Sequence, residues 1–223
     1  MLISIANLLN ADRLDEVHDL AKQVAWSDGA SSAGKTAKQV KHNLQADLTT
    51  RSGTKLRNLL ETAILDHPVF GAAALPNRLV RLLVSKTEAG GGYGMHIDNP
   101  FMATRDGQVR TDLSFTLFLS DPKAYEGGEL VIEQAGQTHS IKPAAGDLIL
   151  YPSTNLHQVN QVTDGTRLAC VGWVESKIRL AEDRALLFDL QNLKASLGQH
   201  FDPQSIEMLT LSQVIANLMR RFC

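Results

Sequence analysis

Residues 113–119 read Leu-Ser-Phe-Thr-Leu-Phe-Leu, a short apolar run of the length and composition that form a β-strand. Similar segments lie on both sides of it and are separated by turn signals such as Glu126-Gly127-Gly128 and Ala145-Gly146. We expect these further strands at residues 78–87, 129–134, 147–151, 157–162 and 167–174. Short strands that recur about every ten residues indicate an all-β sandwich or a jelly roll.

Helical patterns flank this β region on both sides. Leu14, Val17 and Ala21 recur at three- and four-residue steps after Asn10, which suits an N-cap. A second helix is indicated by the apolar residues of 56–64 and should end near His67-Pro68, because the residue before a proline disfavours helix.

The residues between and beyond these helices complete the expected architecture. Residues 31–38 are expected to form a polar loop, and two more helices should follow Ser176 with a break at His200–Pro203. The fold class is therefore α+β, with a jelly-roll core and N- and C-terminal helices packed on it. We divide the chain into a helical region at 1–76, a catalytic β domain at 77–177 and a helical extension at 178–223.

Composition excludes several classes of protein. The chain has 223 residues and a formal charge of −2, and it lacks the clustered basic residues that nucleic acid binding needs. No apolar stretch is long enough for a membrane span. The two cysteines, Cys170 and Cys223, do not suggest a disulfide framework, and the N-terminus makes a poor signal peptide, so we expect the cytoplasm. Trp173 is expected in the core rather than at a cofactor.

His96 and Asp98 are the first candidates for chemistry. They are two positions apart, and residues i and i+2 of a strand point to the same face, so an imidazole and a carboxylate can converge on one metal. His157 begins another expected strand and can supply a third ligand. Two histidines and one carboxylate form the facial triad of non-haem iron(II) oxygenases.

Arg167 distinguishes this triad from a chance H-x-D motif. A tight turn at Asp164-Gly165 would place Arg167 beside the strand of His157. A guanidinium that points into a β core needs a carboxylate partner, because it cannot lose its charge. Its fork of donors suits a ligand dicarboxylate such as 2-oxoglutarate.

Together with His96, Asp98, His157 and Arg167, the motifs YEGGEL at 125–130 and GDLILYPS at 146–153 resemble those of the prolyl 4-hydroxylase-like 2-oxoglutarate dioxygenases. Within them the chain is most similar to the bacterial PKHD-type hydroxylases, including the iron-uptake-associated PiuC group. The resemblance covers almost the whole chain and is most specific at residues 93–174.

This resemblance implies a double-stranded β-helix fold with His96, Asp98 and His157 as iron ligands. Arg167 would pair with the distal carboxylate of 2-oxoglutarate. The implied cofactors are iron(II), 2-oxoglutarate as cosubstrate and O2, with L-ascorbate as a reductant. The implied reaction is hydroxylation of a small molecule or peptide, with a link to iron uptake.

The chain departs from many relatives in one position. They carry a tyrosine nine or ten residues before the first iron-binding histidine, where this chain has Lys86 and Thr87. Thr87, Tyr93 and Tyr151 are the alternatives for the second 2-oxoglutarate contact.

Other readings of the same residues stay open. A cupin-like metalloenzyme would not need Arg167, and a non-catalytic iron or 2-oxoglutarate sensor would bind without turnover. Residues 99–110 line the substrate entrance or form a plain surface loop. A homodimer through the apolar stripes of the tail is a further expectation.

Overall fold

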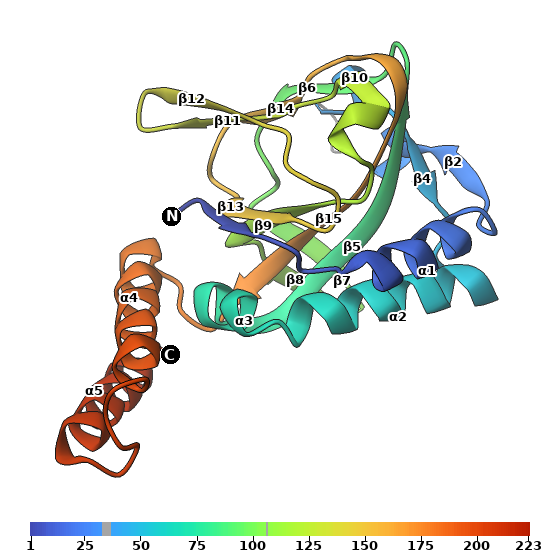
Figure 1. The fold of residues 1–223 in the computed structure, drawn as a ribbon. Helices are drawn as coiled ribbons and strands as arrows, with labels where there is room; N and C mark the ends of the chain where they lie inside the picture. The colour runs from blue at the N-terminus through green and yellow to red at the C-terminus, as the bar shows by residue number, and fades with distance from the viewer. Residues whose placement is uncertain (33–36, 106) are drawn as a thin grey trace.

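The computed structural model describes residues 1–32, 37–105 and 107–223. Two antiparallel sheets face each other, and helices cover the outer side of the larger one (Figure 1). The larger sheet has the order β1 (Ile3–Ile5), β13 (Leu148–Pro152), β9 (Leu113–Phe118), β15 (Val162–Ser176), β5 (Pro76–Glu88), β4 (Leu44–Ala46) and β2 (Trp26–Asp28), and β10 (Tyr125–Gly127) pairs with β15. The smaller sheet has the order β12 (Gln137–Ile141), β11 (Leu130–Gln134), β14 (His157–Val159), β6 (Gly92–His96) and β3 (Lys41–His42).

The central strand β9 shows how the sequence divides the two faces of the larger sheet. Leu113, Phe115 and Leu117 belong to the main hydrophobic core, which α1 (Ala11–Ala21) and α2 (Arg51–Leu65) complete on the outer side. The alternate residues Ser114 and Thr116 line the cavity between the sheets. The period of two along a strand therefore separates an apolar packing face from a polar inner face.

The N-terminal region contains the two expected helices but is not purely helical. The Asn10 side chain accepts a hydrogen bond from the amide of Arg13 at 3.0 Å and caps α1, and α2 ends before Pro68. A third helix, α3 (Pro68–Ala74), was not expected. The strands β1, β2, β3 and β4 add to both sheets, so the expectation of a helical unit at 1–76 is wrong in this respect.

Short 3₁₀ helices lie in some of the connections between these elements. They are η1 (Gly29–Ser32), η2 (Ala37–Val40) and η3 (Pro122–Ala124). The first two lie within or beside the polar loop expected at 31–38, whose residues 33–36 lie outside the described part of the chain.

The hairpin expected at residues 163–166 does not form. β14 lies in the smaller sheet and β15 in the larger one, and β15 continues through Gly165 to pair with β10. Gly165 has φ +74°, and a Cβ there would lie 2.3 Å from the carbonyl oxygen of Ala124. The glycine therefore permits close approach of β10 rather than reversal of the chain.

The tail forms an antiparallel helical hairpin of α4 (Ala181–Leu197) and α5 (Ile206–Phe222). Leu187 and Ile215 pack with Leu75 and Ile178 in a cluster separate from the main core. The hairpin projects from the rest of the molecule (Figure 1), so it packs on the end of α3 and on itself rather than across the sheets. Within the described residues, no helix is long and apolar enough to cross a membrane.

Candidate active site

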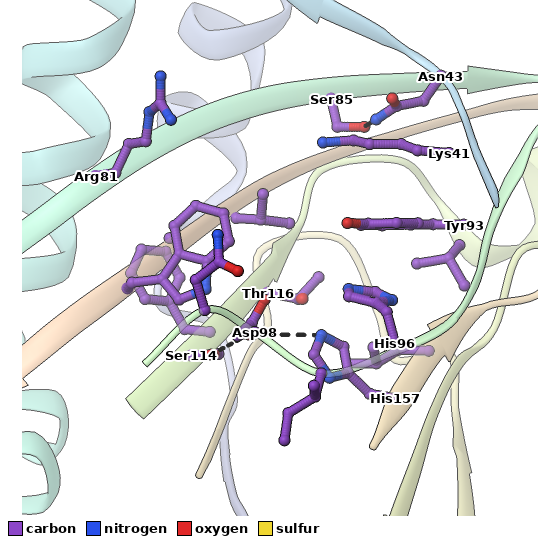
Figure 2. Close-up of a pocket in the computed structure, with 18 of the residues that line it drawn as sticks. Lys41, Asn43, Arg81, Ser85, Tyr93, His96, Asp98, Ser114, Thr116 and His157 are labelled. Carbon is purple, nitrogen blue, oxygen red and sulfur yellow. Dashed lines mark hydrogen bonds and ion pairs between the residues drawn. The ribbon is translucent and has the colours of Figure 1, made fainter. Parts of the chain in front are cut away.

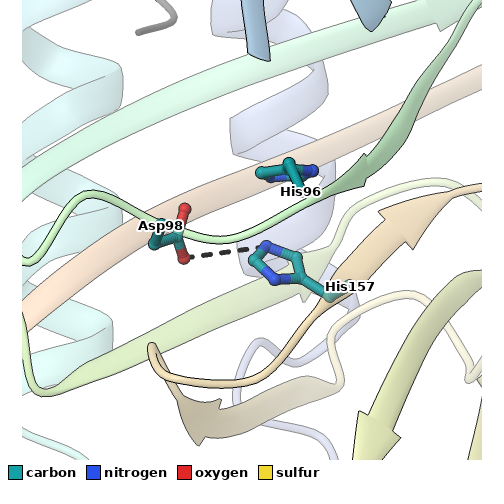
Figure 3. Close-up of side chains that lie close together, drawn as sticks. All are labelled: His96, Asp98 and His157. Atoms are coloured by element: carbon teal, nitrogen blue, oxygen red, sulfur yellow. Dashed lines mark ion pairs between the residues drawn. The ribbon is translucent and has the colours of Figure 1, made fainter. Parts of the chain in front are cut away.

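Three side chains that could hold a metal ion meet between the two sheets. His96 ends β6, Asp98 follows two residues later, and His157 begins β14. His96 and His157 are cross-strand partners, so their side chains lie on one face of the smaller sheet. One potential ligand atom from each of the three residues lies within 4.8 Å of the others (Figure 3).

Hydrogen bonds leave the same ring nitrogen of each histidine available to a metal. The His96 Nδ1 lies 2.8 Å from the carbonyl oxygen of Gly94, and the His157 Nδ1 lies 3.0 Å from that of Asn155. Each Nδ1 can donate to its carbonyl, which leaves each Nε2 as the free donor of a lone pair. Burial, followed by the proximity of His157, lowers the pKa of His96 to about 4. The neutral imidazole that metals require is therefore the form present at pH 7.

Asp98 is held in place from the larger sheet. The hydroxyl of Ser114 donates to its Oδ2 at 2.6 Å, and the Ser114 oxygen lies 2.7 Å from that of Ser153. The same Oδ2 lies 3.6 Å from the Nε2 of His157. Because both serines are buried, this short relay fixes the orientation of the carboxylate.

Aromatic rings enclose the two histidines. The Tyr93 ring stacks on His96 with centroids 3.6 Å apart, and the Tyr151 ring meets His157 edge-on at 5.1 Å. The Lys41 ammonium lies 5.0 Å from the centroid of Tyr93. Burial raises the pKa of Tyr151 above its usual value, so its hydroxyl remains a hydrogen-bond donor.

Arg167 is placed on β15 at the inner face of the larger sheet. Its side chain is 2% exposed, and its Nε and Nη2 are buried without a hydrogen-bond partner. The guanidinium carbon lies 5.1 Å from the centroid of the Phe118 ring. Burial lowers the pKa of Arg167 from its usual value, although an arginine remains charged. Such a group needs an anion, because burial of an unpaired charge is costly.

The YEGGEL segment gives Arg167 its space. Gly128 has φ +67°, and a Cβ on it would lie 3.0 Å from the Cδ of Arg167 and 2.9 Å from the Cε2 of Tyr125. Thr87 is the cross-strand partner of Arg167 and is also buried. A residue larger than glycine at position 128 would therefore press on the guanidinium stem.

One cavity of about 420 Å³ connects Arg167 with His96, Asp98 and His157. Residues 99–110 were expected to line the substrate entrance or to form a plain surface loop. Four of them line the cavity, namely Asn99, Phe101, Met102 and Ala103. They begin a small hairpin of β7 (Phe101–Thr104) and β8 (Gly107–Arg110). Residue 106 of the expected segment lies outside the described residues.

Among the lining residues that sequence reasoning missed are Lys41 and Arg81 (Figure 2). Trp173 was expected in the core, yet it also lines the cavity. Neither cation stands in a motif, and only the pairing of β3 and β5 into the two sheets brings them to the site. The one local signal is that Arg81, Ser85 and Thr87 fall on the same face of β5 by the period of two along a strand.

The donor set and its surroundings fit a divalent iron. Two neutral imidazoles and one carboxylate on one side leave coordination positions free toward the cavity. The orphaned guanidinium of Arg167 in the same cavity fits a dicarboxylate that reaches the metal with its other end.

Comparisons with known proteins give relatives among the iron(II) oxygenases. Residues 82–175 match the family model of the 2OG-Fe(II) oxygenase superfamily. The chain is 49% identical to a PKHD-type hydroxylase of Hyphomonas neptunium, with 98% of each chain covered. It is 44% identical to a PKHD-type hydroxylase of Synechococcus elongatus, covering 100% of this chain and 99% of that one.

Solved structures show the same fold at low sequence identity. A prolyl hydroxylase of Trichoplax adhaerens, in complex with a peptide of hypoxia inducible factor, aligns with a TM-score of 0.60 and 21% identity, covering 83% of this chain and 86% of that one. HygX of Streptomyces hygroscopicus, with nickel and 2-oxoglutarate bound, aligns with a TM-score of 0.56 and 13% identity, covering 78% and 82%.

Proposed function

We propose that His96, Asp98 and His157 bind the iron(II) of this chain, which belongs to the PKHD-type hydroxylases of the 2OG-Fe(II) oxygenase superfamily and is a 2-oxoglutarate-dependent dioxygenase. The observation that carries the assignment is the convergence of one potential ligand atom from each residue within 4.8 Å. The double-stranded β-helix that the resemblance implies is part of this proposal, and the two facing antiparallel sheets support it.

Arg167 is the proposed anchor of 2-oxoglutarate. Its Nε and Nη2 form two adjacent donors without a partner, and this fork matches the two oxygens of the distal carboxylate. The dicarboxylate would extend from Arg167 to the iron through the single cavity that both line.

Tyr151 is the better placed of the three alternatives for the second 2-oxoglutarate contact. Its ring meets the ring of His157 edge-on, and it lines the same cavity as Asp98 and Arg167. The ring of Tyr93 stacks on His96, and the ammonium group of Lys41 lies over the same ring. Thr87 is the buried cross-strand partner of Arg167 on β5.

The bound iron, 2-oxoglutarate and O2 supply the oxidising chemistry that turns a C–H bond into C–OH while 2-oxoglutarate becomes succinate and CO2. The chain itself positions the reactants. Ser114 fixes Asp98, the backbone carbonyls fix both imidazoles, and the apolar residues around Tyr151 and Leu130 exclude water from the anchor end. L-ascorbate as a reductant stays a prediction.

The substrate class within the proposal is a small molecule or a peptide side chain. A link to iron uptake rests on the resemblance alone. Its test is metabolite profiling of a deletion strain against wild type under iron limitation.

Turnover tests the proposed function. The purified protein should convert 2-oxoglutarate to succinate only with iron(II) and O2, and His96→Ala, Asp98→Ala and His157→Ala should each abolish this while the fold persists. Full activity in any one variant would remove that residue from the triad. Binding without turnover would favour a sensor, and metal-dependent activity without 2-oxoglutarate would favour a cupin-like enzyme.

A homodimer through the α4–α5 hairpin is the proposed assembly. Leu186, Leu193 and Leu209 are exposed on this projecting hairpin. Sedimentation at micromolar concentrations tests it, and a strictly monomeric species would contradict it.

A further inference from the structure

The glycine-rich segment at residues 90–94 carries a single side chain, and that side chain contacts a candidate iron ligand. Tyr93 lies between Gly92 and Gly94 on β6. Its ring stacks on the ring of His96, with the centroids 3.6 Å apart and the planes inclined by 20°. The segment therefore presents one aromatic ring to the metal site.

The glycines allow neighbouring chain to approach this segment closely. A Cβ on Gly91 would lie 2.6 Å from the carbonyl oxygen of His42, and a Cβ on Gly94 would lie 2.9 Å from the Cβ of Val40. Both neighbours belong to the segment around β3, which pairs with Tyr93. The absence of side chains on both sides of Tyr93 thus lets β3 and the turn before it pack against β6.

This packing encloses the Tyr93 ring on both faces. The ring of His96 covers one face, and the ammonium group of Lys41 lies 5.0 Å from the centroid. Figure 2 shows Lys41 and His96 on opposite sides of the ring. Burial, and then the charge of Asp98, raises the pKa of Tyr93 to about 12, so the phenol is neutral at pH 7. A ring with neighbours on both faces has little room to turn away from His96.

The stack restrains a motion of His96 that its hydrogen bond leaves open. The contact of the His96 Nδ1 with the carbonyl oxygen of Gly94, at 2.8 Å, fixes one point of the ring. A ring held at one point can still tilt, and contact along its face restrains that tilt and with it the position of Nε2. The ring of Tyr151 meets His157 edge-on at 5.1 Å, so the two histidines are supported differently.

We propose that Tyr93 is a positioning residue that holds the His96 ring in the orientation required for iron(II) binding. The inference rests on the proposed function, because it takes His96 as an iron ligand. It assigns this role to the ring of Tyr93 and not to its hydroxyl. Groups that orient a metal ligand from outside the coordination shell typically change metal affinity by about 10- to 100-fold.

Metal affinity tests the role of the ring. Co(II) binding to the protein without 2-oxoglutarate is measured by competition with a chelator, and the visible absorption bands of Co(II) report the geometry of its ligands. Tyr93→Leu should bind Co(II) about tenfold more weakly and shift the bands. Tyr93→Phe, which keeps the ring, should match the wild type in both. Tyr93→Met replaces Tyr93→Leu if the latter does not fold.

Trp26→Leu is the matched control. The Trp26 ring on β2 also lies under a lysine, because the Lys86 ammonium is 5.1 Å from its centroid, but Trp26 does not line the cavity. Its loss should leave the Co(II) affinity and the absorption bands unchanged.

Wild-type affinity and bands in Tyr93→Leu would overturn the inference. So would an equal loss in Tyr93→Phe, which would assign the effect to the hydroxyl. An equal loss in Trp26→Leu would also overturn it, because the effect would then be a general loss of stability. Failure of the proposed function is distinguishable, since His96→Ala would then bind Co(II) as tightly as the wild type.

Discussion

His96 and His157 are directly opposite each other on neighbouring antiparallel strands, and each turns its Nδ1 to the carbonyl of the residue two positions earlier. This repeated local geometry fixes both rings before any metal is bound. Both Nε2 atoms could then bind a metal together with Asp98 without rearrangement of β6 or β14. The site is therefore preorganised for a metal by the register of one strand pair.

Ser114→Ala should weaken iron(II) binding without removing a ligand. Ser114 donates to the Oδ2 of Asp98 at 2.6 Å, and loss of a contact that orients a metal ligand typically costs about 10- to 100-fold in affinity. Competition with a chelator measures the effect. Ser153→Ala, one hydrogen bond further away, should have a smaller one. Equal affinity of Ser114→Ala and wild type would show that the contact does not orient Asp98.

Tyr151→Phe should weaken 2-oxoglutarate binding by about fivefold, the equivalent of one neutral hydrogen bond of roughly 1 kcal/mol. The ring that contacts His157 stays, so iron affinity should hold. Titration of 2-oxoglutarate into the iron(II) protein under anaerobic conditions measures both. If Thr87→Val shows the larger loss and Tyr151→Phe none, Thr87 is the second contact.

Gly128→Ala should reduce both stability and 2-oxoglutarate affinity. Its positive φ costs a side chain about 1–2 kcal/mol, and its Cβ would press on the Cδ of Arg167. Gly136→Ala is the matched control, because it has φ +79° with no atom within 4 Å of its Cβ. Thermal unfolding should show a loss in both variants and a larger one in Gly128→Ala, whose Cβ also meets buried side chains. The 2-oxoglutarate affinity should fall only in Gly128→Ala. Unchanged affinity there would mean that the Arg167 stem adapts.

The candidate triad could be predicted from sequence because its pattern is local. The period of two on a strand places His96 and Asp98 on one face, and His157 follows a turn. Arg167 was placed in the site by a hairpin that does not exist. Arg167 still reaches the cavity because its strand, β15, belongs to the larger sheet, which faces the sheet that contains β14. Arg167 and His157 therefore lie on facing sheets and are not joined by a turn.

The remaining differences come from interactions distant in the sequence. β1 and β2 have three residues each, too few to show an alternation, and they form only because a sheet edge accepts them. Lys41 and Arg81 line one cavity because β3 and β5 belong to the two sheets that enclose it. The expected packing of the tail on the core is limited to the start of α4, where Phe188 packs on the main core, and the apolar residues of α4 and α5 otherwise face each other.

The most direct test of the account is the anaerobic titration of 2-oxoglutarate into the iron(II) protein, followed by the charge-transfer absorption of a chelated 2-oxo acid. Arg167 offers two unpartnered buried donors, and charge-assisted hydrogen bonds are worth about 1.5–3 kcal/mol each. Wild type should therefore bind 2-oxoglutarate at least about 10- to 100-fold more tightly than Arg167→Ala, with Arg167→Lys between them and iron affinity equal in all three. Equal 2-oxoglutarate affinity in wild type and Arg167→Ala, or no absorption band in wild type, would contradict it.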